Sequence, residues 1–319
     1  MNHKESSLKD SKLDFSLKLI PGFDIDESEL SDEIVMIWDT TNLITSYNLI
    51  TKQVKKESVE NLPFGSFLEN NRFLNCPQKV YISGGVVEGR KLTNLFFVLE
   101  RKSNNIKRLQ EMPIAVTRHS LINLYSRTLV LVGGKNNMGC YFYNVPKDQW
   151  ELFNSINYER EDASLLFYND ILFLFGGILD IKASFLNIII EYTHLDERRN
   201  SLWKVLDVSV NVPENNLSDL KRLSGCGVIS SELIKNRVII CGGYNNENSD
   251  EVNYVYELTI AEENSEFFKR NDLHICIPNW FQESNFVSLQ NKFYNFDIDG
   301  NLHSFSLDME KFFVQEYKF

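Results

Sequence analysis

Short apolar runs that each end in a pair of glycines recur along the middle of the chain. They read VYISGG, LVLVGG, LFLFGG and VIICGG, and their last residues are Gly85, Gly134, Gly177 and Gly243. A run of this length, rich in branched and aromatic residues, predicts a strand that is buried on both faces. Glycines suit a sharp turn at the end of such a strand, because glycine adopts positive φ and lets another backbone come close.

The residues around each glycine pair repeat as well. After each pair come an apolar or aromatic run, a polar turn and a further run, which contains Trp150 in one repeat and Trp203 in another. Before three of the pairs an arginine opens another apolar run, and these arginines are Arg118, Arg160 and Arg222. The pattern therefore predicts four antiparallel strands in each repeat, joined by short turns. The pairs recur at intervals of roughly 50 residues, a period that is typical of repeat proteins.

Two degenerate units flank these four repeats. Residues 33–56 carry Trp38-Asp39-Thr40 where the glycine pair stands in the other repeats. Residues 285–317 carry Phe296-Asp297 at the same place. With these two units the count of repeats is six; because both units lack the glycine pair, five and seven are the alternatives.

The N-terminal residues contain one more strand candidate, LDFSLKLI at residues 13–20. It has two readings: the innermost strand of the first unit, which we favour, or an outer strand that completes the last unit. Residues 1–12 are polar and mixed in charge, and we expect them to form a disordered tail.

This layout resembles the kelch-repeat β-propeller family. The resemblance implies an all-β fold, a six-bladed kelch-type β-propeller with four-stranded antiparallel blades over residues 13–319, in which the first and last blades are degenerate. Kelch propellers commonly bind proteins on one rim, so the resemblance also implies a protein-binding rim. The residues that carry it are Gly84, Gly85, Gly133, Gly134, Gly176, Gly177, Gly242 and Gly243, with Tyr143, Tyr192, Tyr256, Trp150 and Trp203 after the pairs and the three arginines before them.

The connectivity of such a sheet predicts where that rim lies. In a four-stranded antiparallel meander the second and fourth strands end at the same face, so the loops after the glycine pairs meet the arginine-bearing segments there. Arginines at this rim bind the carboxylates of an acidic peptide in one reading, since the guanidinium pairs with carboxylates in a bidentate way. In the other reading they bridge neighbouring blades through backbone carbonyls. The candidate partner-binding residues are Arg90, Arg118, Lys135, Asn136, Arg160, Arg222, Tyr244, Asn245 and Arg270.

Composition narrows the partners and the location. The formal net charge is −11, which argues against binding nucleic acid or an anionic membrane, because both depend on clustered Lys and Arg. The five cysteines are scattered without a CxxC motif, a pattern that suits free thiols in a cytoplasmic protein. Alanine, the best helix former, is nearly absent, while the chain has 23 Phe and 13 Tyr, which favours β structure.

No catalytic or metal-binding motif stands out. The five histidines do not occur at metal-ligand spacings, and we expect no cofactor or metal; His119, beside a repeat arginine, is predicted to be packed or hydrogen-bonded within a strand. We therefore expect a non-enzymatic protein–protein interaction scaffold or a subunit of a larger cytosolic or cytoskeletal assembly. The alternative is a small-molecule or sugar-binding propeller enzyme. The polar insertion at residues 208–221 is predicted to be a protruding loop, which either carries specificity or is only tolerated.

Overall fold

The computed structural model describes the chain in segments. They are residues 33–37, 40–76, 78–124, 127–168, 170–179, 190–195 and 202–206, followed by the ten strands β20 to β29 between residues 223 and 313. The expected tail at 1–12, the strand candidate at 13–20 and the insertion at 208–221 lie outside the described residues. So do Arg222 and the fourth glycine pair, residues 242–243.

The described residues form antiparallel sheets and, apart from one short 3₁₀ turn at Glu88–Arg90, no helix. One main sheet has three strands and five have four strands in sequence order. The three-stranded sheet contains β1 (Glu33–Ile37), β2 (Leu43–Asn48) and β3 (Val54–Ser58). The next two contain β4 (Arg72–Asn75), β5 (Lys79–Ser83), β8 (Phe96–Glu100) and β9 (Asn105–Arg108), then β10 (Ser120–Leu124), β11 (Thr128–Val132), β12 (Gly139–Asn144) and β13 (Gln149–Ser155).

The remaining three main sheets complete the series. They contain β15 (Ser164–Tyr168), β16 (Ile171–Phe175), β18 (Ile190–His194) and β19 (Lys204–Leu206); β21 (Gly227–Ser230), β22 (Arg237–Cys241), β24 (Tyr254–Ile260) and β25 (Phe268–Cys276); and β26 (Val287–Leu289), β27 (Lys292–Phe296), β28 (Leu302–Ser306) and β29 (Lys311–Phe313). The last of these sheets lies in the C-terminal unit, and Phe296 ends its second strand.

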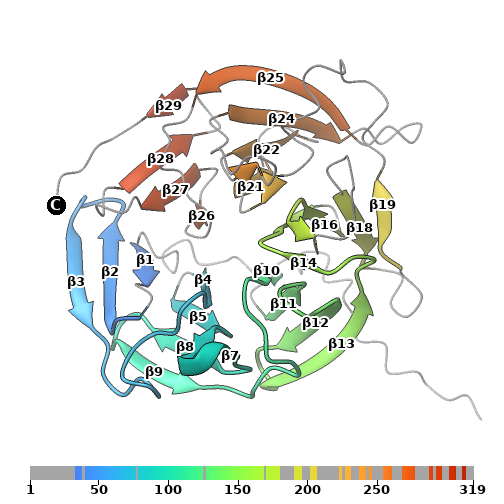
Figure 1. Ribbon diagram of the computed structural model, residues 1–319. Helices are drawn as coiled ribbons and strands as arrows, with labels where there is room; N and C mark the ends of the chain where they lie inside the picture. The colour runs from blue at the N-terminus through green and yellow to red at the C-terminus, as the bar shows by residue number, and fades with distance from the viewer. Residues whose placement is uncertain are drawn as a thin grey trace, which may run out of the picture.

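The sheets are arranged around a common centre, as in a β-propeller (Figure 1). The first strands of successive sheets lie next to one another near this centre: β4 contacts β10, β10 contacts β15, and β15 contacts β21. Three small two-stranded pairings lie beside the main sheets: β6 (Val86–Val87) with β7 (Lys91–Leu92), β14 (Arg160–Glu161) with β17 (Ile178–Leu179), and β20 (Leu223–Ser224) with β23 (Tyr244–Asn245).

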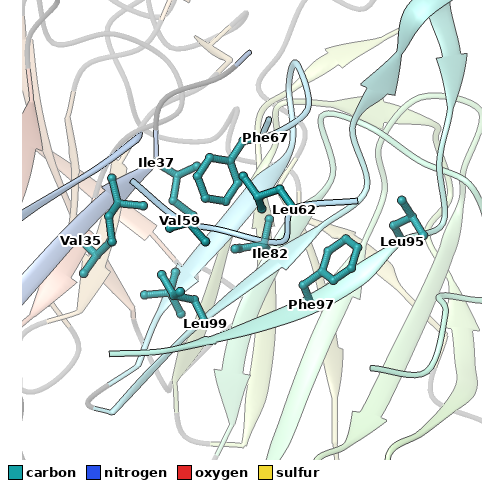
Figure 2. Close-up of a cluster of buried hydrophobic side chains, with 11 residues drawn as sticks. Val35, Ile37, Val59, Leu62, Phe67, Ile82, Leu95, Phe97 and Leu99 are labelled. Atoms are coloured by element: carbon teal, nitrogen blue, oxygen red, sulfur yellow. The ribbon is translucent and has the colours of Figure 1, made fainter. Parts of the chain in front are cut away.

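The second strands β5, β11 and β16 are buried on both faces, as their apolar runs predict. In β5, Val80 and Ile82 face a cluster shared with β1 and β2, which Figure 2 shows, while Tyr81 faces the next sheet. In β11, Leu129 packs toward the preceding sheet and Val130 toward the following one. Because successive side chains of a strand point to opposite faces, a run without polar positions requires a sheet on each side.

The two tryptophans each join a sheet to the one before it. The indole Nε1 of Trp150 donates to the carbonyl oxygen of Gln110 at 3.1 Å. The indole Nε1 of Trp203 donates to Oδ1 of Asn154 in β13 at 2.7 Å, and Trp203 itself is buried. The repeated tryptophan thus serves packing between sheets, which agrees with its assignment as a structural repeat residue.

The three-stranded sheet lacks, among the described residues, an equivalent of the innermost strand of the other sheets. β1 takes the position of a second strand. Thr40 follows it with φ of 60° and donates its N–H to the carbonyl oxygen of Phe67. Gly85 and Gly134 donate in the same way to the segments that lead into the next sheets. The side-chain amide of Asn75 binds β1 at the edge that is not paired with β2. It accepts from the N–H of Val35 at 3.0 Å and donates to its carbonyl oxygen at 2.9 Å. Arg101 donates to the carbonyl of Glu33 at 2.8 Å.

The backbone of the described glycine pairs lies close to neighbouring backbone. Gly134 has φ of 94°, and its N–H donates to the carbonyl oxygen of Arg160 at 2.7 Å. A Cβ at this position would lie 2.5 Å from Cγ2 of Val116 and 2.7 Å from the carbonyl oxygen of Thr117. Gly85 has φ of 105° and donates to the carbonyl of Val116 at 3.1 Å. The glycines therefore meet both the positive φ and the close approach that the sequence predicts.

We expect Gly134→Ala to lower the free energy of unfolding by about 3 kcal/mol, because strained φ and a clash with backbone add together. Gly65→Ala is the matched control: Gly65 has φ of 72°, but a Cβ there meets nothing within 4 Å. This control should cost only about 1 kcal/mol, from backbone strain alone. Denaturant unfolding of both variants measures the difference, and equal losses would contradict the packing argument.

Candidate functional site: a rim of loops and strand entries

The rim is built from two kinds of segment. The post-glycine loops, residues 86–92 and 135–138, follow the second strands, and the entry segments, residues 67–71, 116–119 and 160–163, lead into the first strands. Backbone hydrogen bonds join them: Val86 N donates to Glu69 O at 2.9 Å, and Lys135 N donates to Thr117 O at 3.0 Å. The pairs β14–β17 and β20–β23 make the same connection in two further sheets. The prediction that these segments meet is confirmed.

Three of the candidate side chains are exposed on the post-glycine loops. Arg90 ends the 3₁₀ turn at Glu88–Arg90, with φ of 62°. Lys135 and Asn136 stand at the tip of the next loop, and the N–H of Asn136 donates to Oε1 of Glu159 at 2.6 Å. These positions are open to a partner.

Arg118 is only partly exposed and belongs to a charge cluster. Its guanidinium pairs with Glu161 at 3.2 Å and with Asp162. Asp162 also accepts from Arg72 at 2.6 Å, and Nε of Arg72 donates to the carbonyl oxygen of His119 at 2.8 Å. Two cations and two anions from three successive sheets therefore neutralise one another. Arg118 thus bridges neighbouring sheets, but it does so through carboxylates and not through the backbone carbonyls that the second interpretation names.

Arg160 is fully buried and cannot reach a partner, so its place among the partner-binding candidates is corrected. Its NH1 donates to the carbonyl oxygen of Gly176 at 2.9 Å, and its NH2 pairs with Glu191, which is equally buried. Burial lowers the pKa of Arg160, and the Glu191 carboxylate opposes this shift. Glu191 also accepts from the side-chain amide of Asn157 at 3.0 Å. Arg160 thus ties the entry segment to the second and third strands of its own sheet.

The remaining candidates fall on the later sheets. β23 places Tyr244 and Asn245 opposite Ser224 and Leu223 at the rim. Arg270 was expected to precede an innermost strand, but it lies inside β25, the outermost strand of its sheet, opposite Leu258. The reason is the length of β25, which runs from Phe268 to Cys276 and takes in residues that the repeat pattern assigns to an entry segment.

Sequence reasoning missed Arg72 and Asp162. Arg72 opens the run RFLN ahead of the first glycine pair, so the repeat itself contained the signal. Asp162 follows Arg160 and Glu161 in the sequence, but nothing in that tripeptide specifies a partner ninety positions away. His119 is buried, as predicted, with Nε2 2.7 Å from Oγ of Ser83.

Comparison with known proteins adds evidence on the fold. No family model matches the chain, and no curated protein matches it. A solved structure described as the structure of YjhT is similar, with a TM-score of 0.65 over 90% of this chain and 95% of that one. The two sequences are 11% identical, so the likeness concerns the fold alone.

The described part of the chain contains neither a metal-binding cluster nor a membrane-spanning helix. No group of three or more His, Cys, Asp or Glu side chains there is arranged to hold a metal ion. No helix in that part of the chain is long and apolar enough to cross a membrane.

The buried pair predicts a large stability effect. Arg160→Met leaves the Glu191 carboxylate buried without its cation, and we expect a loss of roughly 3–5 kcal/mol in the free energy of unfolding. Arg160→Met combined with Glu191→Leu should cost less than the single change, because no buried charge remains. Urea unfolding of both variants tests this, and a double variant less stable than the single one would argue against it.

His119 predicts a pH dependence of stability. Burial, reinforced by Arg72, lowers the pKa of His119 from 6.5 to about 3 in the folded protein. The unfolded chain therefore binds the proton more readily, and the free energy of unfolding falls as the pH drops from about 6.5 toward 3, by up to ~1.4 kcal/mol per pH unit. Above pH 6.5 the contribution is complete.

The comparison of native protein and His119→Gln isolates this contribution, because glutamine does not titrate. Unfolding measured between pH 7 and 4 should show a shallower pH slope for the variant. Identical slopes would mean that His119 is not held neutral by the fold.

Proposed function

We propose that the chain is a closed, six-bladed kelch-type propeller that acts as a non-enzymatic scaffold and binds a protein partner on its rim. The six main sheets in sequence order and the adjacent first strands support this architecture. The spread of the sheets around one centre supports it as well (Figure 1). The binding role rests on the rim.

The observation that carries the proposal is that some cations at the rim are paired or buried within the fold, while others are exposed and, among the described residues, unpaired. Arg72 and Arg118 are neutralised within the charge cluster, and Arg160 is buried. Arg90, Lys91 and Lys135 are exposed on two neighbouring post-glycine loops, and within the part of the chain described by the structure they form no ion pair. In a chain of net charge −11 these loops present cations that the fold itself does not use.

Such loops suit an acidic segment of a partner protein. Rim charges contribute mainly to association rate and partner choice, and their effect weakens with salt. The partner thus approaches the post-glycine loops while the entry arginines hold the sheets in place behind them. We propose that this partner belongs to a cytosolic or cytoskeletal assembly in which the chain is one subunit.

Charge reversal of the exposed loops tests the proposal. The variant Arg90→Glu/Lys91→Glu/Lys135→Glu should retain less than about one tenth of the partner captured by the native protein, because each attraction becomes a repulsion. Affinity purification followed by quantitative mass spectrometry provides the measurement.

The matched control is Lys52→Glu/Lys102→Glu/Lys147→Glu, which changes the net charge equally. These lysines are exposed in the turns between the third and fourth strand positions, at the opposite ends of the strands. The control should capture the native set of partners. An unchanged partner set in the loop variant, or an equal loss in the control, would refute binding at this rim.

A further inference from the structure

The side chain of Asn71 stands out at the start of β4. It is only 7% exposed, and neither its Oδ1 nor its Nδ2 has a hydrogen-bond partner. A buried amide without hydrogen-bond partners destabilises the folded protein, so it calls for an explanation. In the neighbouring residue, the main-chain carbonyl oxygen of Asn70 accepts a hydrogen bond from Oγ1 of Thr117.

Asn71 lines a cleft at the rim. Apart from Ser66, the other walls are apolar, and they come from the loop between β3 and β4 and from the second sheet. Four of them, Leu62, Phe67, Ile82 and Phe97, belong to the buried cluster in Figure 2. The cleft holds about 300 Å³ of empty space including its open mouth, and its enclosed part has room for about one water-sized group.

An exposed aromatic side chain lies at this cleft. Phe64 is 56% exposed and is one of its lining residues, next to the exposed Pro63. The loop turns at Gly65, which has φ of 72°. Exposed aromatic residues beside a small pocket are typical anchor points in protein interfaces.

The same strand shows what an asparagine amide binds in this fold. Asn75, four residues farther along β4, pairs with the N–H and the carbonyl of Val35, at 3.0 and 2.9 Å. The N–H and carbonyl of one extended residue match the acceptor and donor of a side-chain amide. Asn71 immediately precedes β4 and lines a cleft formed in part by the buried cluster against which Phe73 packs, so it lies on the side of the sheet that faces β1, as Asn75 does.

We propose that the Asn71 cleft binds the main chain of an extended partner segment, whose apolar side chain packs on Phe64. A peptide edge projects only a hydrogen and an oxygen toward Asn71, which suits the narrow inner part of the cleft. This inference rests on the proposed function, in that the ligand is a protein. It adds a neutral, main-chain contact to the charged contacts of the post-glycine loops.

A neutral probe tests this contact apart from the charges. N-acetyl-leucine N′-methylamide carries one residue's N–H and carbonyl with an apolar side chain and no charge. We expect its addition to the full-length protein to shift the side-chain amide signals of Asn71 in ¹H–¹⁵N spectra. These signals are assigned by their loss in Asn71→Leu.

The variants separate binding from folding. Asn71→Leu should weaken probe binding about tenfold or more, yet leave the protein as stable as before or more so, because it removes an unsatisfied buried amide. Phe64→Ala should weaken binding as well. Ile50→Ala, which alters an exposed apolar residue in the β2–β3 turn, should leave binding unchanged.

Several results would overturn the inference. They are the absence of any shift on adding the probe, equal binding by Asn71→Leu, or a crystal structure in which Asn71 holds only an ordered water in the presence of the probe. Because the probe is neutral, its binding does not depend on Arg90, Lys91 or Lys135. A failure of the cleft is thus distinguishable from a failure of the charged rim.

Discussion

The packing of the sheets depends on the close approach of the glycine pairs at 84–85 and 133–134 to two entry segments at once. Gly134 donates its N–H to the entry segment of the following sheet and leaves no room for a Cβ beside the entry segment of its own. This contact fixes the spacing between neighbouring sheets at their rim ends. It also brings the post-glycine loops and the entry segments together, so the same constraint that packs the sheets assembles the candidate binding surface.

Charged side chains at the rim fall into two groups, those on the entry segments and those on the post-glycine loops. Side chains on the entry segments are used internally, as in the cluster of Arg72, Arg118 and Asp162 and in the buried pair of Arg160 with Glu191. Buried ion pairs need partners on every side, and they resist replacement of either member alone. The exposed Arg90, Lys91 and Lys135 of the post-glycine loops form no such pairs with the described residues, so these positions are free to differ between proteins that share the fold.

The sequence predicted the repeated strands well, because glycine pairs and doubly buried runs leave strong local signals. It predicted the rim for the same reason: connectivity follows from strand order. It failed where the outcome depends on distant partners. Arg160 and Arg118 stand at the same place in their repeats. Arg160 is buried and paired with Glu191, whereas Arg118 stays partly exposed. The unsatisfied amide of Asn71 left no sequence signal, since it follows from what surrounds the residue.

The join between β1 and β4 has a consequence for how such a chain changes over time. Elsewhere a ladder of main-chain hydrogen bonds fixes the alignment of adjacent strands, so one inserted residue reverses every side chain. At the edge of β1 that faces β4, the hydrogen bonds come instead from the side chains of Asn75 and Arg101. Single substitutions can therefore remodel it without disturbing any ladder.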